Sequence, residues 1–254
     1  MEKLSAVIIC LNEEGNIGAA IESLAFADEV VVVDSGSTDR TMEIARSKSA
    51  RVLEHTFENY GSQKNWGLDQ CTYDWVLVLD ADERINTELG KEIAAKLQNP
   101  GDHAAYSIPR RNFFMGQEVR YSGWQNDRVI RLVDRRRARH TETAVHEKVR
   151  CLGPVGQLRH KMDHYTYQDL NSYLRKSWDY AILGAIDRYP SHTKVTAYHL
   201  WLKPVWGFIK KYLFQLGFLD GRIGLIIAMQ YSNYLFYRAL NLWRLQEGEK
   251  IEQP

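Results

Sequence analysis

The stretch Trp75-Val-Leu-Val-Leu-Asp-Ala-Asp82 decides the fold, because an apolar run ends there on two carboxylates. A second stretch, Glu29-Val-Val-Val-Val-Asp-Ser-Gly-Ser-Thr-Asp39, has the same form. Short apolar runs of this kind predict buried parallel strands. Ligands bind beyond the carboxyl ends of such strands, so we expect Asp34, Asp80 and Asp82 to share one crevice. Neighbouring carboxylates repel one another unless a hard cation lies between them, which predicts a divalent metal holding a diphosphate.

Strands and helices alternate around these two stretches. We expect strands at 6–10, 29–34, 51–55 and 75–80, and helices at 17–24, 38–47, 62–71 and 87–97. Thr38 with Asp39, and later Thr87, are expected to cap two of the helices. This alternation predicts right-handed crossovers and an α/β fold with a Rossmann-like, mostly parallel sheet.

The pattern changes after residue 100, where two more strands are expected at 104–110 and 128–133. A helix at 168–189 and an aromatic-rich stretch at 195–245 follow. We therefore expect an α/β domain over residues 1–165 and a helical region over residues 166–254.

The helical region has two interpretations. Its longest uncharged run, 223–237, is shorter than the ~20 apolar residues of a bilayer span. Trp201, Trp206, Tyr212 and Trp243 stand near lysines, which favours amphipathic helices lying in a membrane interface. The alternative is a helical subdomain packed on the sheet.

Composition narrows the classes of protein. The 254 residues are 44% hydrophobic and 26% charged, as in globular proteins, and the net charge of +1 gives no bias toward nucleic acid. Three cysteines without paired spacing suit a reducing compartment. The first residues lead into a strand without a signal-peptide pattern, so we expect a cytoplasmic catalytic part.

The sequence does not match two classes of phosphate-binding enzymes. A haloacid-dehalogenase-type phosphatase needs a second aspartate where Gly36 stands, and the Gly-x-x-x-x-Gly-Lys-Ser/Thr loop of P-loop NTPases does not occur.

Several motifs together resemble a known family. They are Val7-Ile-Ile-Cys-Leu-Asn-Glu13, Asp34-Ser-Gly-Ser-Thr-Asp-Arg-Thr41, Gln63-Lys-Asn-Trp-Gly67 and Leu79-Asp-Ala-Asp-Glu83. The chain resembles family 2 glycosyltransferases with the GT-A fold. Further matches, among them Val145-His-Glu147, His164-Tyr165 and Gly217-Phe-Leu-Asp-Gly-Arg-Ile-Gly224, are similar to the bacterial lipopolysaccharide core β-1,4-glucosyltransferase subgroup.

The resemblance implies a role for each matched residue. The residues implied to hold the uridine diphosphate are Ile9, Leu11, Glu13, Asp34, Lys64 and Asp80. Those implied to ligate Mg2+ or Mn2+ are Asp82, Asp80 and His164, although His164 is equally compatible with a buried histidine bonded to backbone.

The base and the acceptor site are also implied. Glu147 stands where inverting members carry the base that takes the acceptor hydroxyl's proton. Asp127 is the alternative base, unless Arg128 beside it forms a structural ion pair. Trp124, Arg128 and Arg131 are candidates for acceptor contacts, although Trp124 fits a core position as well.

The expected function is that of a metal-dependent inverting hexosyltransferase. It would move a hexose, expected to be glucose, from a UDP-sugar to a lipopolysaccharide core heptose or another lipid-linked saccharide. We expect the protein to lie on the anionic cytoplasmic face of the inner membrane. A polyprenyl-phosphate glycosyltransferase and a membrane-peripheral scaffold with an inactive donor site remain the alternatives.

Overall fold

The computed structural model describes residues 2–141, 148–167, 169–191 and 194–252. The chain forms two compact units. The first comprises Met1–Arg111 and Asp127–His164, and the second comprises Asn112–Asn126 and Tyr165–Pro254.

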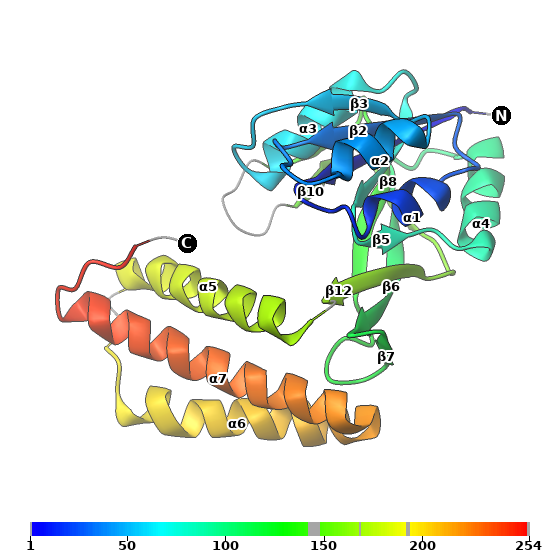
Figure 1. The fold of residues 1–254 in the computed structure, drawn as a ribbon. Helices are drawn as coiled ribbons and strands as arrows, with labels where there is room; N and C mark the ends of the chain where they lie inside the picture. Colours follow the sequence, from blue (N-terminus) through cyan, green and yellow to red (C-terminus); the bar gives the residue numbers. More distant parts are fainter. Residues whose placement is uncertain (1, 142–147, 168, 192–193, 253–254) are drawn as a thin grey trace. The chain divides into compact units, whose positions relative to one another are not determined.

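The first unit contains a parallel half-sheet with the strand order β3-β2-β1-β4 (Figure 1). Its strands are β1 (Leu4–Cys10), β2 (Glu29–Asp34), β3 (Arg51–Glu54) and β4 (Trp75–Asp80). Cys10 pairs in register with Asp34, and Ile9 pairs with Asp80. The two motif carboxylates therefore leave the sheet at the same edge, as the sequence predicts.

Helices cover both faces of this sheet because successive side chains of each strand point to opposite faces. Ala6 and Ile8 belong to one apolar cluster, while Val7 and Ile9 belong to the other. The first cluster is closed by α1 (Ile17–Glu22), α2 (Thr41–Ser47) and α4 (Thr87–Gln98), and the second by α3 (Tyr60–Gln70). Continuous apolar strands are thus buried on both sides.

The sheet continues beyond β4 with antiparallel strands. They are β8 (Arg128–Asp134), β6 (Ala105–Phe114), β12 (Met162–Tyr167) and β5 (Glu83–Arg84), in that order. Strands β7 (Gln117–Val119) and β11 (Val155–Gln157) pair with β6, and β9 (Ala138–His140) pairs with β10 (Val149–Cys151). The predicted α/β fold class is confirmed. Strands β6 and β8 correspond to the strands expected at 104–110 and 128–133, whereas the shorter strands of this half and its antiparallel pairing with β4 were not predicted.

Helix caps differ from the prediction by one residue. Asn86, and not Thr87, caps α4, since its side chain accepts from Leu89 N at 3.0 Å. At α2 the cap position is Arg40, whose side chain makes no cap bond, while the predicted Asp39 accepts from Thr41 N at 2.9 Å. A cap lies just before the first helical residue, where the backbone is still non-helical.

Three long helical stretches build the second unit, and Figure 1 shows them side by side. They are α5 (Leu170–Arg188), α6 (Lys203–Ile209) between the π-helical turns η2 (Tyr198–Leu202) and η3 (Lys210–Phe214), and α7 (Gly221–Gln246). Two short 3-10 turns, η1 (Tyr189–Ser191) and η4 (Gly217–Asp220), complete the connections. Both α5 and α6 pack against α7.

A buried carboxylate ties a loop to these helices. Asp220 accepts hydrogen bonds from Arg120 N at 2.9 Å, Tyr121 N at 3.1 Å and Ser122 Oγ at 2.7 Å. Beside it the backbone of Gly217 lies so close to Gly224 that a Cβ there would be 1.8 Å from the Gly217 carbonyl oxygen. The Gly217–Gly224 motif therefore has a packing role.

Within the described ranges, no single helix has the length and apolar character of a membrane span. The stretches Tyr198–Phe214 and Gly217–Gln246 reach that level only as a pair, by length and composition, and the pair is bent by 71°.

Candidate active site

Asp34 organises its own turn. Its Oδ1 accepts from Gly36 N at 2.9 Å and Ser37 N at 2.7 Å, and its Oδ2 accepts from the Ser37 hydroxyl. Gly36 adopts a φ of +96°, which a glycine tolerates without strain. Because Asp34 is fully buried and accepts these bonds, the carboxylate is placed to hold the loop. The direct contact from Asp34 to a nucleoside stays a prediction.

The loop after β1 is joined to the same turn. Glu13 N donates to Thr41 Oγ1 at 2.8 Å, and the Glu13 carboxylate accepts from Asn16 Nδ2 at 2.7 Å. Ile9 is buried at the strand end, whereas half of the Leu11 side chain is exposed. Ile9, Leu11 and Glu13 thus lie at the predicted edge of the sheet, with Leu11 open to a ligand.

Two cations hold Asp80 at the end of β4. Lys64 Nζ, from the buried face of α3, lies 3.1 Å from Asp80 Oδ1. Arg131 Nη2, from β8, contacts Asp80 Oδ2. Burial alone would raise the pKa of the Asp80 carboxyl, but the charges of Arg131 and Lys64 outweigh burial and hold the pKa well below its ordinary value. Both oxygens of Asp80 are thus engaged by protein cations.

Glu83 and two arginines extend this network. The Glu83 side chain is fully buried, and its Oε1 lies 2.8 Å from Arg131 Nη2 and 3.5 Å from Arg110 Nη1. Arg110 in turn holds Asp127 with two bonds, of 2.8 and 2.9 Å. The ion pair expected for Asp127 is present, but its partner is Arg110 and not Arg128. The sequence pattern carried no sign of Arg110, and Glu83 was visible only as a neighbour of Asp82.

Asp82 and His164 form a separate pair. His164 Nε2 lies 3.4 Å from Asp82 Oδ2, and β12 brings the histidine there because His164 pairs with Glu83 across the β5–β12 ladder. Asp82 Oδ1 is buried and has no hydrogen-bond partner among the described residues. A buried acceptor oxygen without a hydrogen-bond partner lowers the stability of the fold, unless a bound ligand interacts with it.

The side chains of Asp82 and His164 are suitable ligands for a divalent cation that also binds the substrate. Over the described ranges, no three His, Cys, Asp or Glu side chains gather into a metal cage. Mg2+ in phosphate-handling sites is commonly bound by one or two carboxylates, with the remaining positions filled by substrate phosphates and water. The unpartnered Asp82 oxygen and the His164 ring match such an incomplete protein shell.

The acceptor candidates are placed differently from one another. Arg128 donates from Nη1 to the carbonyl oxygens of Ser107 and Leu158, at 2.9 and 3.0 Å. Arg131 is 5% exposed and forms ion pairs with Asp80 and Glu83, so it belongs to the ionic network of the site. Trp124 packs in the second unit against Phe114 and its neighbours. Glu147 lies outside the described residues.

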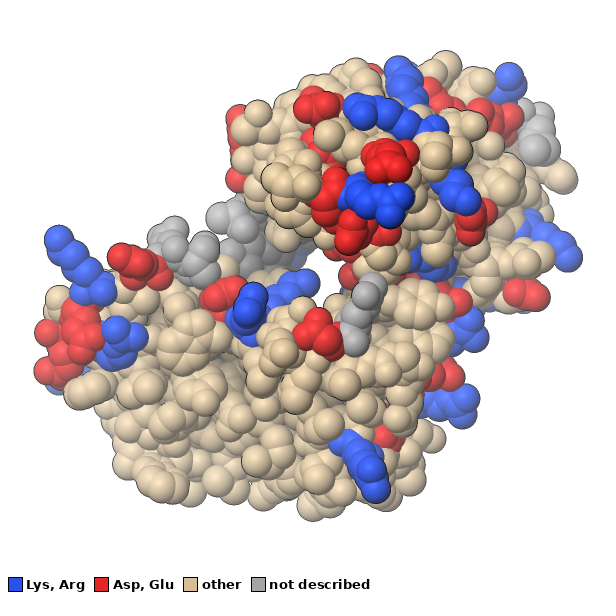
Figure 2. Space-filling model, viewed as in Figure 1, with Lys and Arg blue, Asp and Glu red and all other residues tan. Residues whose placement is uncertain are grey.

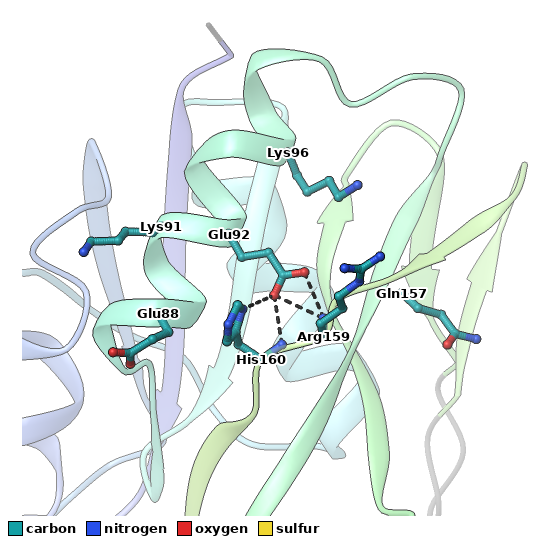
Figure 3. Close-up of a pocket in the computed structure, with 7 residues that line it drawn as sticks. All are labelled: Glu88, Lys91, Glu92, Lys96, Gln157, Arg159 and His160. Carbon is teal, nitrogen blue, oxygen red and sulfur yellow. Dashed lines mark hydrogen bonds and ion pairs between the residues drawn. The ribbon is translucent and has the colours of Figure 1, made fainter.

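A cavity of about 580 Å³ lies on the outer side of α4 (Figure 3). Its lining is charged, and Glu92 at its centre accepts from His160 Nδ1 at 2.9 Å. None of the residues predicted from the sequence lines it. The ionic network at the end of β4 is therefore the better candidate site.

Comparison with known proteins gives concordant matches. Residues 5–152, more than half of the chain, match glycosyl transferase family 2. The lipopolysaccharide core biosynthesis glycosyltransferase LpsC of Rhizobium meliloti is 30% identical over 95% of this chain and 92% of its own length. An uncharacterized glycosyltransferase of Rickettsia typhi is 29% identical over 97% of this chain and 88% of its own length.

Among solved structures, a match covers 44% of each chain at 26% identity with a TM-score of 0.37. That protein is glucosyl-3-phosphoglycerate synthase from Mycobacterium tuberculosis, in complex with Mn2+, uridine diphosphate and glucosyl-3-phosphoglycerate. So partial a likeness places no single residue of the present site. The family match and the long alignment with the lipopolysaccharide core enzyme are the stronger findings, and they confirm the resemblance drawn from the motifs. This chain belongs to glycosyl transferase family 2.

Proposed function

We propose that the protein transfers a hexose from a UDP-sugar to a saccharide of the lipopolysaccharide core, using a divalent cation. The main support for the metal at the donor site comes from Asp82. Its buried Oδ1 has no hydrogen-bond partner among the described residues, and its Oδ2 lies 3.4 Å from His164 Nε2. Asp82 and His164 would hold Mg2+ or Mn2+. When bound, that ion stabilises negative charge on the leaving diphosphate.

The cations around Asp80 complete the donor site in this proposal. Lys64 and Arg131 present positive charge at the strand end where the diphosphate would lie. Asp80 neutralises part of that charge and fixes both side chains, so they need little reordering when an anionic ligand arrives. In this arrangement Asp80 positions cations, and Asp82 is the carboxylate left for the metal.

Transfer with inversion needs a group that removes the acceptor proton as the hydroxyl attacks the anomeric carbon. Glu147 remains our proposed base. Asp127 is the less suitable alternative, because Arg110 already engages both of its carboxylate oxygens.

The acceptor class is inferred from the relative. The long alignment with a lipopolysaccharide core enzyme supports a core saccharide acceptor, for which a heptose is our expectation. Glucose is likewise the expected hexose.

The experiment is turnover of a panel of UDP-hexoses by the full chain with Mn2+, in the presence of a heptose-bearing core saccharide. One UDP-hexose should be consumed, and Glu147→Gln should reduce turnover by roughly 100-fold or more while donor affinity is unchanged. If Asp127→Asn were inactive and Glu147→Gln active, Asp127 would be the base. If the wild-type chain turned over none of the panel, the proposed reaction would be wrong.

We also propose that the helices of the second unit lie on an anionic membrane surface. Exposed apolar side chains gather along η2, α6 and η3, where Trp201 is 71%, Phe214 69% and Leu202 64% exposed. Figure 2 shows a broad surface over these helices that is largely without charge. Lys210, the first residue of η3, is exposed, and its positive charge suits anionic headgroups.

Lys211 does not share this role. Its ammonium donates to Ser122 O at 2.9 Å and lies 5.0 Å from the centre of the Tyr231 ring. Burial lowers the pKa of Lys211, as expected for an ammonium partly removed from water. Exchanging both Lys210 and Lys211 for glutamate would therefore disturb packing as well as surface charge.

A further inference from the structure

His140 is a buried polar side chain for which the proposed function so far has no use. It is the last residue of β9, and its backbone is fixed by Asn65 of α3. His140 N donates to Asn65 Oδ1 at 2.8 Å, and Asn65 Nδ2 donates to His140 O at 2.9 Å. These two bonds hold the residue in place without involving the ring.

The ring itself is left unpaired. His140 is 6% exposed, and neither Nδ1 nor Nε2 has a hydrogen-bond partner among the described residues. Each buried polar atom left in this state costs about 1–3 kcal/mol, and native proteins contain few of them. Aromatic or aliphatic side chains would fill the same space without that cost.

The surroundings define the chemical form of the ring. Burial lowers the pKa of His140 to about 3, and the charges of Lys64 and Arg131 act in the same direction while that of Asp80 opposes them. The imidazole is therefore neutral near pH 7, with one N–H donor and one acceptor nitrogen. The two bonds to Asn65, the residue next to Lys64, place His140 beside the proposed diphosphate site.

We propose that His140 hydrogen-bonds a hydroxyl group of the donor hexose and so contributes to the choice of sugar. This inference rests on the proposed function. A hydroxyl both donates and accepts, so it can pair with either nitrogen of a neutral imidazole, whereas phosphate oxygens only accept. The hexose is attached directly to the diphosphate, so a side chain beside Lys64 and Arg131 is within its reach.

The test compares the affinities of two ligands, UDP and the UDP-hexose that the wild-type protein consumes, by calorimetry with Mn2+. His140→Phe should weaken binding of the UDP-hexose about 10-fold and leave that of UDP within about twofold, because only the hexose contact is lost. His140→Gln keeps a donor and an acceptor and should retain most of the affinity.

Monodeoxy analogues of the UDP-hexose then identify the contact. One analogue should bind the wild-type protein less tightly than the parent sugar and bind His140→Phe as tightly as the parent sugar does. In addition, ligand-free His140→Phe should unfold at the same or a higher temperature than the wild-type protein, since a polar group without a partner has been removed. A structural histidine would instead give a lower unfolding temperature.

Besides a lower unfolding temperature of His140→Phe, three binding results would overturn the inference. They are unchanged affinity of His140→Phe for the UDP-hexose, an equal loss for UDP and the UDP-hexose, and a His140→Gln variant as weak as His140→Phe. If the wild-type protein bound neither ligand, the proposed function itself would fail, which is a distinguishable outcome.

Discussion

Arg131 bridges two carboxylates, and the consequence of removing it can be measured. Glu83 is fully buried and lies 2.8 Å from Arg131 Nη2. Arg131→Met removes this ionic partner and leaves the carboxylate the longer contact to Arg110 and the hydrogen bond from Asp80 N at 3.0 Å. Breaking a buried ion pair from one side costs about 3–5 kcal/mol. Urea unfolding should show a loss of that size for Arg131→Met. Arg128→Met, which removes bonds to carbonyl oxygens, should cost about 1 kcal/mol. Equal midpoints for the two variants would contradict the network described for Arg131.

His140 should make stability depend on pH. Its pKa is about 3 in the folded chain, against an ordinary value of about 6.5. Between these values the unfolded chain binds the proton and the folded chain does not, so stability falls as the pH falls. The charges of Lys64, Arg131 and Asp80 act on the ring, and Asp80 stays ionised in this range because its own pKa is lowered.

The effect can be isolated with one variant. From pH 7 to pH 5 the free energy of unfolding of the wild-type protein should fall by about 2 kcal/mol more than that of His140→Phe. Parallel pH profiles for the two proteins would show that the His140 ring takes up its proton over the same pH range in the folded and the unfolded chain, which contradicts the lowered pKa.

Single residues show what the sequence could predict about the site. Asp80 ends a strand and Asp82 follows it, as the apolar run predicts. Lys64 and His164, whose roles the resemblance implied, lie beside them. Asp34 ends a strand just as Asp80 does, yet its own turn satisfies it. A sequence pattern locates the end of a strand but does not reveal which carboxylate finds its partners locally. The arginine partners of Asp80 and Asp127 lie on strands that are far from these residues in the sequence. The spacing of the motifs therefore could not predict them.

At the scale of elements, the close approach of η4 to α7 gives a sharp prediction. A Cβ at Gly224 would lie 1.8 Å from the Gly217 carbonyl oxygen, which is backbone and cannot rotate away. Gly224→Ala should destabilise the second unit by about 1–3 kcal/mol, the usual cost of overpacking. In Gly184→Ala the new Cβ meets only side-chain atoms of Arg238 and Tyr234, at 3.0 and 3.2 Å. That control in α5 should be close to neutral in thermal unfolding, and similar losses for both variants would point to a general intolerance of alanine.

The strands differ in how well the sequence predicts them. The parallel strands β1, β2 and β4 are buried on both faces and read as unbroken apolar runs. Strand β6 carries Pro109, Arg110 and Arg111 in its middle, and the two arginines form ion pairs with Asp127 and Asp163. The prediction ended this strand at Arg110, four residues before its end at Phe114. Charged residues within a strand thus make its end hard to predict from an apolar pattern.

At the scale of the whole molecule, a membrane-binding assay can tell whether the exposed apolar side chains of the second unit contact lipid or are only exposed to water. Leu202 in η2 is 64% exposed, and Leu152 in the first unit is 77% exposed. Leu202→Glu should reduce binding to vesicles that contain anionic lipid, because a charge replaces apolar contact and is repelled by the headgroups. Leu152→Glu makes the same chemical change and should bind as the wild-type protein does. Cosedimentation measures both, and equal binding of the two variants would leave the helices as a packed subdomain.

The most direct test of the donor site is the effect of Mn2+ on UDP affinity in the full chain. Calorimetry should show UDP binding to the wild-type protein at least about 10-fold more tightly with Mn2+ than in EDTA, because a cation at Asp82 links protein and diphosphate. Asp82→Asn should lose this gain, whereas Asp127→Asn, whose carboxylate is held by Arg110, should keep it. Equal UDP affinity with Mn2+ and with EDTA, or a full Mn2+ effect in Asp82→Asn, would contradict the metal site proposed here.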